Sequence, residues 1–87
     1  SAGKPTAKGR NNWLTQAFLK SIDLVSKNEN GFFIMAEAAQ VDYGGHANQL
    51  PYVVSEVLDF DKLVSAAIAY ADKDGETLVI ITADHET

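Results

Sequence analysis

Two groups of acidic and imidazole side chains in this sequence have the types and spacing of metal ligands. Asp84 and His85 are adjacent and directly follow a run of β-forming residues. Asp42 and His46 lie four residues apart, and Glu37 precedes them at the end of an apolar run. Carboxylate oxygens and imidazole nitrogens are ligands that suit zinc. The sequence has no cysteine, which excludes thiolate metal sites and a cysteine nucleophile.

The hydrophobic pattern indicates which elements position these side chains. Apolar residues recur with helical spacing over residues 12–27 and again over residues 50–73, so we expect both stretches to be helices. Residues 32–37 and 77–82 are short, continuous apolar runs, which indicate strands that are buried on both faces. Residues 38–49 contain two adjacent glycines and several polar side chains, and they predict a loop.

The element order is therefore α-β-α-β, and the expected fold class is α/β. A strand, a crossover helix and a second strand imply a parallel sheet with one right-handed βαβ connection. In open sheets of this class, ligands bind beyond the carboxyl ends of the strands. The five candidate ligands all fall at that predicted edge, namely Glu37, Asp42, His46, Asp84 and His85.

Each candidate also has an ordinary explanation when it is considered alone. Glu37 equally fits a solvated strand terminus, because a carboxylate that ends an apolar strand must be solvated, paired or bound to a cation. Asp42 fits a turn former, and His46 fits a hydrogen-bonded loop histidine. Their common position favours a metal site, since both histidines of the chain and three of its acids fall at one predicted edge of the sheet. The acids of the second helix are instead expected on its outer, solvated face: Glu56, Asp59 and Asp61.

The bulk composition narrows the classes of function. The chain has 87 residues, of which 46% are hydrophobic, and a formal net charge of −5. Only seven residues are basic and they form no run, which argues against a nucleic-acid partner and against an anionic membrane surface. No apolar stretch approaches the roughly 20 residues of a transmembrane helix. The composition therefore indicates at most one small globular domain.

The two groups together resemble those of a known family. Residues 31–37, then Asp42 and His46, then residues 77–87 with the sequence Thr-Ala-Asp-His are similar in type and spacing to the second half of the metal-ligand set of alkaline phosphatases. The resemblance covers residues 12–87. It rests on two motifs that match in residue type, in internal spacing and in their separation along the chain.

The resemblance implies a role for each candidate ligand. Glu37 matches the magnesium ligand of the family. Asp42 and His46 match ligands of one catalytic zinc ion. Asp84 and His85 match ligands of the second zinc ion. The complete protein would therefore hold two zinc ions and one magnesium ion, whereas we expect the isolated chain to bind metal weakly or not at all.

Several parts of the family's active site have no counterpart in this sequence. The family needs an Asp-Ser pair that supplies a serine nucleophile, a further histidine and, in many members, a phosphate-clamping arginine. The only arginine is Arg10, and no catalytic residue is identified in the chain. We therefore expect residues 1–11 to be a flexible lead-in. Residues 12–87 would be a partial alkaline-phosphatase-like α/β domain, incomplete at both ends.

By the same resemblance, the chain is an internal fragment of a hydrolase that cleaves phosphate monoesters, inactive by itself and periplasmic or secreted. Alternatives in the same superfamily are a phosphodiesterase, a sulfatase or a phosphoglycerate-mutase-like enzyme. An alternative of another class is a non-catalytic metal-binding or interaction module. Unpaired sheet edges also predict that the isolated piece is marginally stable or self-associates through those edges. A homodimer is a further expectation.

Overall fold

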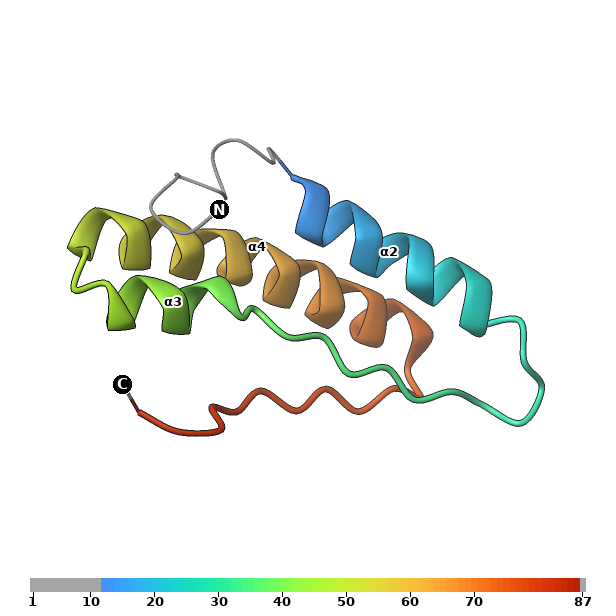
Figure 1. Ribbon diagram of the computed structural model, residues 1–87. Helices are drawn as coiled ribbons and strands as arrows, with labels where there is room; N and C mark the ends of the chain where they lie inside the picture. The colour runs from blue at the N-terminus through green and yellow to red at the C-terminus, as the bar shows by residue number, and fades with distance from the viewer. Residues whose placement is uncertain (1–11, 87) are drawn as a thin grey trace.

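The computed structural model describes residues 12–86, in which three helices are joined by turns and extended segments (Figure 1). α2 spans Trp13–Val25, α3 spans Gln40–His46 and α4 spans Leu50–Asp74. Both shorter helices pack against α4, which is therefore the scaffold of the described chain. The expected flexible lead-in, residues 1–11, lies outside the described residues.

The long helix α4 supplies most of the small core. Its apolar residues recur with helical spacing, and the prediction of a helix over residues 50–73 is confirmed. The helix ends at Gly75, which adopts the left-handed φ of 78° that residues with a side chain rarely adopt. The Gly75 N–H donates to the Ala71 carbonyl at 2.8 Å, which satisfies one of the terminal carbonyls. The buried hydrophobic residues are Tyr52, Leu63 and Ala67 of α4 with Ile22 of α2.

The first predicted helix, residues 12–27, is confirmed as α2. Leu14, Phe18 and Ile22 follow one another at intervals of four residues and form one apolar stripe. Ile22 is the most buried of them, and it anchors this stripe in the core. In the described part of the chain, no helix combines the length and the apolar character that crossing a membrane requires.

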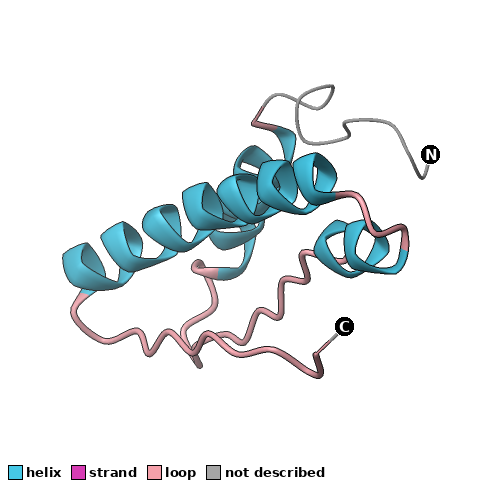
Figure 2. Cartoon of the chain, turned by 90° about the vertical axis from the view of Figure 1, so that its left-hand side faces the viewer, coloured by secondary structure: helices cyan, strands magenta, loops and turns pink. Residues whose placement is uncertain are grey.

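The expected α/β fold is wrong, because residues 12–86 contain helices and no β-strand. The two apolar runs, residues 32–37 and 77–82, are extended and lie side by side beneath α4 (Figures 1 and 2). They form no hydrogen-bonded ladder, and a sheet exists only where neighbouring backbones exchange hydrogen bonds. The parallel sheet and its right-handed βαβ crossover are therefore replaced, in the described chain, by three helices and two extended segments.

The expectation that both faces of these segments are buried is also wrong. Phe32 packs edge to face against Tyr70 of α4, with ring centroids 6.3 Å apart. The next residue, Phe33, is 86% exposed. Leu78 and Ile80 are 81% and 76% exposed on the second segment. Alternate side chains of an extended backbone point to opposite faces, so one face of each segment packs toward the helices and the other faces solvent.

The predicted loop over residues 38–49 is wrong as well, because it contains α3. The two adjacent glycines indicate a bend, yet Gly44 lies buried within the helix. A Cβ atom at Gly44 would lie 3.1 Å from the backbone nitrogen of Val53 and 3.2 Å from Cδ1 of Tyr52. Glycine therefore permits the close approach of α3 to α4, where the sequence suggested a turn.

The buried stripe of α4 predicts that truncating two leucines of the same helix has very different effects on the free energy of unfolding. Leu63 is 6% exposed and Leu58 is 58% exposed. Leu63→Ala should lower the free energy of unfolding by about 2–3 kcal/mol through lost burial and a residual cavity. Leu58→Ala is the matched control, since it makes the same change in helix propensity, and it should cost at most about 0.5 kcal/mol. Urea unfolding followed by circular dichroism measures both, and equal losses would contradict this description of the core.

Candidate metal centre

The helix α3 brings Asp42 and His46 together. Residues four apart are neighbours on a helix surface, and Asp42 Oδ2 lies 3.3 Å from His46 Nε2. The Asp42 side chain is 34% exposed and that of His46 is 69% exposed, so the pair sits at the surface. The sequence predicts that a loop joins these two residues, but one helical turn does so in the structure. We call Asp42 and His46 the α3 pair.

Two contacts hold the α3 pair in place through α4. The first is the close approach of Gly44 to Val53, where an added Cβ atom would lie 3.1 Å from the Val53 backbone nitrogen and would force α4 or α3 to shift. The second is a hydrogen bond that the Tyr52 hydroxyl donates to Gln40 Oε1, at the first residue of α3. Tyr52 is only 5% exposed, so its ring is fixed by packing. The position of the α3 pair is therefore set by the packing of α3 on α4.

Asp84 and His85 form the second pair, which we call the C-terminal pair. Adjacent residues of a regular strand would point to opposite faces, but the chain bends at Asp84. Asp84 Oδ2 lies 3.4 Å from His85 Nε2. The other ring nitrogen, Nδ1, lies 3.0 Å from the Glu86 carbonyl oxygen. When Nδ1–H donates to that carbonyl, Nε2 is the nitrogen left for a metal ion.

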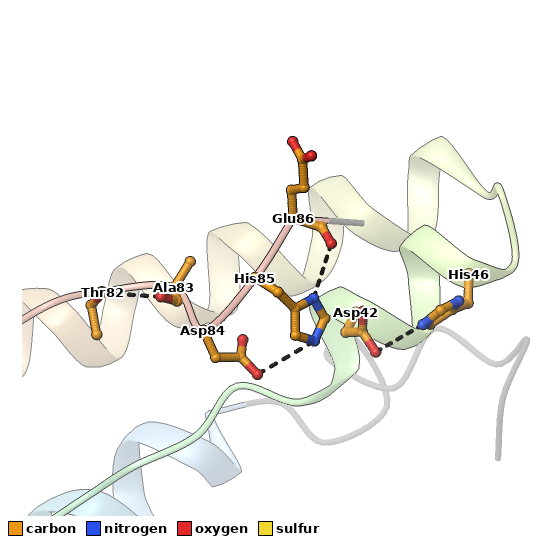
Figure 3. A network of polar contacts seen from close by, with 7 residues as sticks. All are labelled: Asp42, His46, Thr82, Ala83, Asp84, His85 and Glu86. Carbon is orange, nitrogen blue, oxygen red and sulfur yellow. Dashed lines mark hydrogen bonds and ion pairs between the residues drawn. The ribbon is translucent and has the colours of Figure 1, made fainter.

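In Figure 3 the C-terminal pair is seen on the side of α3 that carries the α3 pair, with the His85 ring toward Asp42. The hydrogen bond to the Glu86 carbonyl raises the pKa of His85 above its ordinary 6.5, and the charge of Asp84 raises it further. The charge of Asp42 also raises this pKa, although Asp42 belongs to the other pair. Groups that are far apart in the sequence therefore share one electrostatic environment.

The donor chemistry of the two pairs fits zinc. Each pair offers one carboxylate oxygen and one imidazole nitrogen, and zinc accepts both kinds of atom, usually with about four ligands. Within residues 12–86, however, no group of three or more acidic or imidazole side chains has the arrangement of a complete metal site. Each pair can therefore supply part of a zinc site, and further ligands have to come from elsewhere.

Glu37 belongs to neither pair. It lies on the extended segment before α3 and is exposed. Among the described residues, its carboxylate takes part in no hydrogen bond or ion pair. A hard, solvated oxygen donor suits magnesium, which keeps several waters and needs only one or two carboxylates.

Sequence reasoning missed two buried acids on α4. Glu56 and Asp59 are 3% and 4% exposed, whereas an outer, solvated position was the expectation for both. Asp61, from the same set, is exposed as expected. Both buried carboxylates interact with other groups of the chain. Their spacing was the available signal, because they continue the helical stripe between Tyr52 and Leu63.

Comparison with known proteins gives a family match for most of the chain. The family profile of alkaline phosphatase matches residues 7–87. Alkaline phosphatase 4 of Bacillus subtilis is 46% identical over 69 residues, which cover 79% of this chain. The alkaline phosphatase of Escherichia fergusonii is 47% identical over 72 residues, or 83% of this chain, and that of Escherichia coli is 46% identical over the same length. No solved structure matches the chain.

These relatives are much longer than the chain. The matched region is 15% of the length of each of the three. The chain therefore corresponds to one segment of such a protein, which agrees with a site that is built only in part.

The close contact at Gly44 predicts that a larger side chain there displaces α3. Gly44→Val should lower the free energy of unfolding by about 1–3 kcal/mol, because the added atoms overlap the α4 backbone. Ala47→Val is the matched control, since Ala47 is exposed at the end of the same helix. Urea unfolding of both variants measures the difference. Equal effects would show that the Gly44 contact does not position α3.

The surroundings of His85 predict the direction in which its pKa is shifted. We expect a pKa above 6.5, and Asp84→Asn should lower it by removing one of the two neighbouring charges. Protonated His85 then stabilises the fold below pH 6.5, and this contribution is lost as the pH rises through the raised pKa. NMR titration of the imidazole C–H signals measures the shift, with Asp72→Asn as a control for net charge. An unchanged pKa in Asp84→Asn would mean that the ion pair does not form in solution.

Proposed function

This chain belongs to the alkaline phosphatase family, and we propose that it is the segment of a metal-dependent phosphomonoester hydrolase that supplies part of the metal centre. The proposal is supported by the family match over residues 7–87 together with two acid–imidazole pairs, Asp42 with His46 at 3.3 Å and Asp84 with His85 at 3.4 Å. The two pairs lie about forty positions apart in the sequence, and α4 lies between them along the chain.

We assign the metal ligands as the family resemblance implies. Asp42 and His46 would hold a first zinc ion, and Asp84 and His85 would hold a second. Glu37 would hold magnesium. The oxygen and nitrogen donors of the two pairs support this assignment by their chemistry. The separate, solvated position of Glu37 is compatible with a different metal ion.

When bound, the two zinc ions would stabilise the attacking and leaving oxygens of a phosphate ester during in-line displacement. The residues of this chain would orient the metal ligands before the metal ions bind. The Glu86 carbonyl fixes the His85 ring through Nδ1, which leaves Nε2 directed at Asp84. The packing of Gly44 on Val53 fixes α3 and so the α3 pair. These two contacts reduce the movement of the ligand side chains that metal binding would require.

The nucleophile and the remaining ligands would lie in other segments of the longer protein. We therefore propose that the 87-residue chain is inactive by itself. The substrate of the whole protein would be a phosphate monoester. A periplasmic or secreted location is proposed from the family resemblance alone. Self-association of the chain is also proposed, and the exposed apolar side chains of the extended segments support it.

The proposal is tested in the whole protein that contains this segment. His46→Gln and Asp84→Asn should each lower kcat/KM for a chromogenic phosphate monoester by at least about 100-fold, since even indirect supports of metal ligands are worth 10–100-fold. Both variants should also lose bound zinc, measured by elemental analysis. Asp72→Asn, an exposed acid at the end of α4, is the matched control and should retain activity and zinc.

Two results would contradict the proposal. One is full activity of His46→Gln and Asp84→Asn. The other is preferential hydrolysis of a phosphodiester or a sulfate ester by the whole protein. The isolated chain should show no turnover above a metal-only blank and only weak zinc binding by calorimetry. Tight, stoichiometric zinc binding by the isolated chain would instead support a metal-binding module without catalysis.

A further inference from the structure

The short helix α3 depends on contacts outside itself, because seven residues are too few for a stable isolated helix. Two of the seven are glycines, which lower the helix propensity further. Its N-cap residue is Ala39, whose methyl side chain cannot accept a hydrogen bond from the first-turn amides. The orientation of α3, and with it that of the α3 pair, is therefore set by its neighbours.

The carboxyl end of α3 is closed by its own backbone. Asn48 adopts a left-handed φ of 53°, which asparagine tolerates better than most residues. The Gln49 N–H donates to the Gly44 carbonyl at 3.2 Å. The Asn48 N–H donates to the Gly45 carbonyl at 3.0 Å. These two hydrogen bonds form a Schellman motif, which satisfies the terminal carbonyls of this end.

At the amino end, a side chain of α4 supplies the contact. Tyr52 is 5% exposed, and its hydroxyl donates a hydrogen bond to Oε1 of Gln40, the first residue of α3. The same ring lies against Gly44, where an added Cβ atom would be 3.2 Å from Tyr52 Cδ1. Gln40 and Gly44 are four residues apart and therefore lie on one face of α3. Tyr52 thus contacts this face over one helical turn.

The α3 pair lies on the opposite face of the helix. Successive helical residues are rotated by about 100°, so Asp42 lies about 200° from Gln40 around the helix axis, and His46 follows one turn later. The exposed fractions agree, since Gly44 is buried while the side chains of Asp42 and His46 are 34% and 69% exposed. A rotation of α3 about its axis would swing both ligand side chains. The hydrogen bond from Tyr52 resists that rotation.

We propose that Tyr52 is a positioning residue for the first zinc ion and that it acts through Gln40. The inference rests on the proposed function, which assigns that ion to the α3 pair. The Tyr52 hydroxyl fixes the rotation of α3 before the metal ion binds, so binding requires less ordering of the ligands. The C-terminal pair lies on another segment, so its zinc ion should not depend on this hydrogen bond.

The test uses the whole protein that contains this segment, in two backgrounds that each keep one zinc ion. Asp84→Asn leaves the ion of the α3 pair, and His46→Gln leaves the ion of the C-terminal pair. Tyr52→Phe keeps the ring and removes only the hydroxyl. It should weaken zinc binding about tenfold or more in the first background and leave it unchanged in the second. Competition with a chromogenic chelator measures the affinity. Tyr70→Phe, the same change near the other end of α4, is the matched control and should alter neither.

Two further measurements separate positioning from a general loss of stability. Gln40→Leu should weaken the same site as Tyr52→Phe does, and the two together should cost no more than either alone, because they remove one hydrogen bond. Gln40→Glu keeps an acceptor and should retain the affinity. In the metal-free protein, Tyr52→Phe should speed the hydrogen exchange of the α3 amides and not that of the α2 amides.

Three results would overturn the inference: equal weakening of both zinc sites, an unchanged first site, or unchanged hydrogen exchange in α3. If Tyr52→Phe fails to fold, Gln40→Leu carries the same test at a partly exposed side chain. The proposed function fails separately. Retention of both zinc ions by His46→Gln and by Asp84→Asn would refute the ligand assignment, whereas loss of one ion from each, with no effect of Tyr52→Phe, would refute only the role of Tyr52.

Discussion

The buried stripe of α4 is the surface against which both other helices pack, and it carries most of the interior of this chain. At one end of the stripe, Tyr52 and Val53 contact α3 at Gly44, where even a Cβ atom would be in tighter contact than ordinary packing allows. The small number of buried apolar residues makes that contact important. A chain of this size has little other surface with which to hold a short helix in one orientation.

The candidate metal centre depends on the same packing. One helical turn is enough to bring Asp42 and His46 together. Where this pair lies relative to the C-terminal pair depends on how α3 packs against α4. The two buried acids, Glu56 and Asp59, lie on the stripe as well. A buried carboxylate is tolerated only when other groups compensate its charge, and both have such interactions. The buried stripe of α4 is thus partly polar, and the hydrophobic pattern predicts the burial of only some of its side chains.

The two extended segments show what an apolar run requires before it becomes a strand. Their residues favour β structure, they are extended, and they are neighbours (Figure 2). Without exchanged backbone hydrogen bonds they remain separate segments. Phe32 finds an aromatic partner in Tyr70, whereas Phe33 finds none on the opposite face.

The sequence alone determined the two long helices, the choice of the five candidate ligands and the family, because periodicity and motif spacing are local properties. The tertiary structure decided what depends on neighbours. Gly44 was a loop signal by composition and proved to be a packing contact, because only the distance to Val53 distinguishes the two. Glu56 is buried and Asp61 exposed on one helix, and Leu63 is buried while Leu78 is not. Residue type cannot separate such cases, since burial depends on which surface lies opposite each side chain.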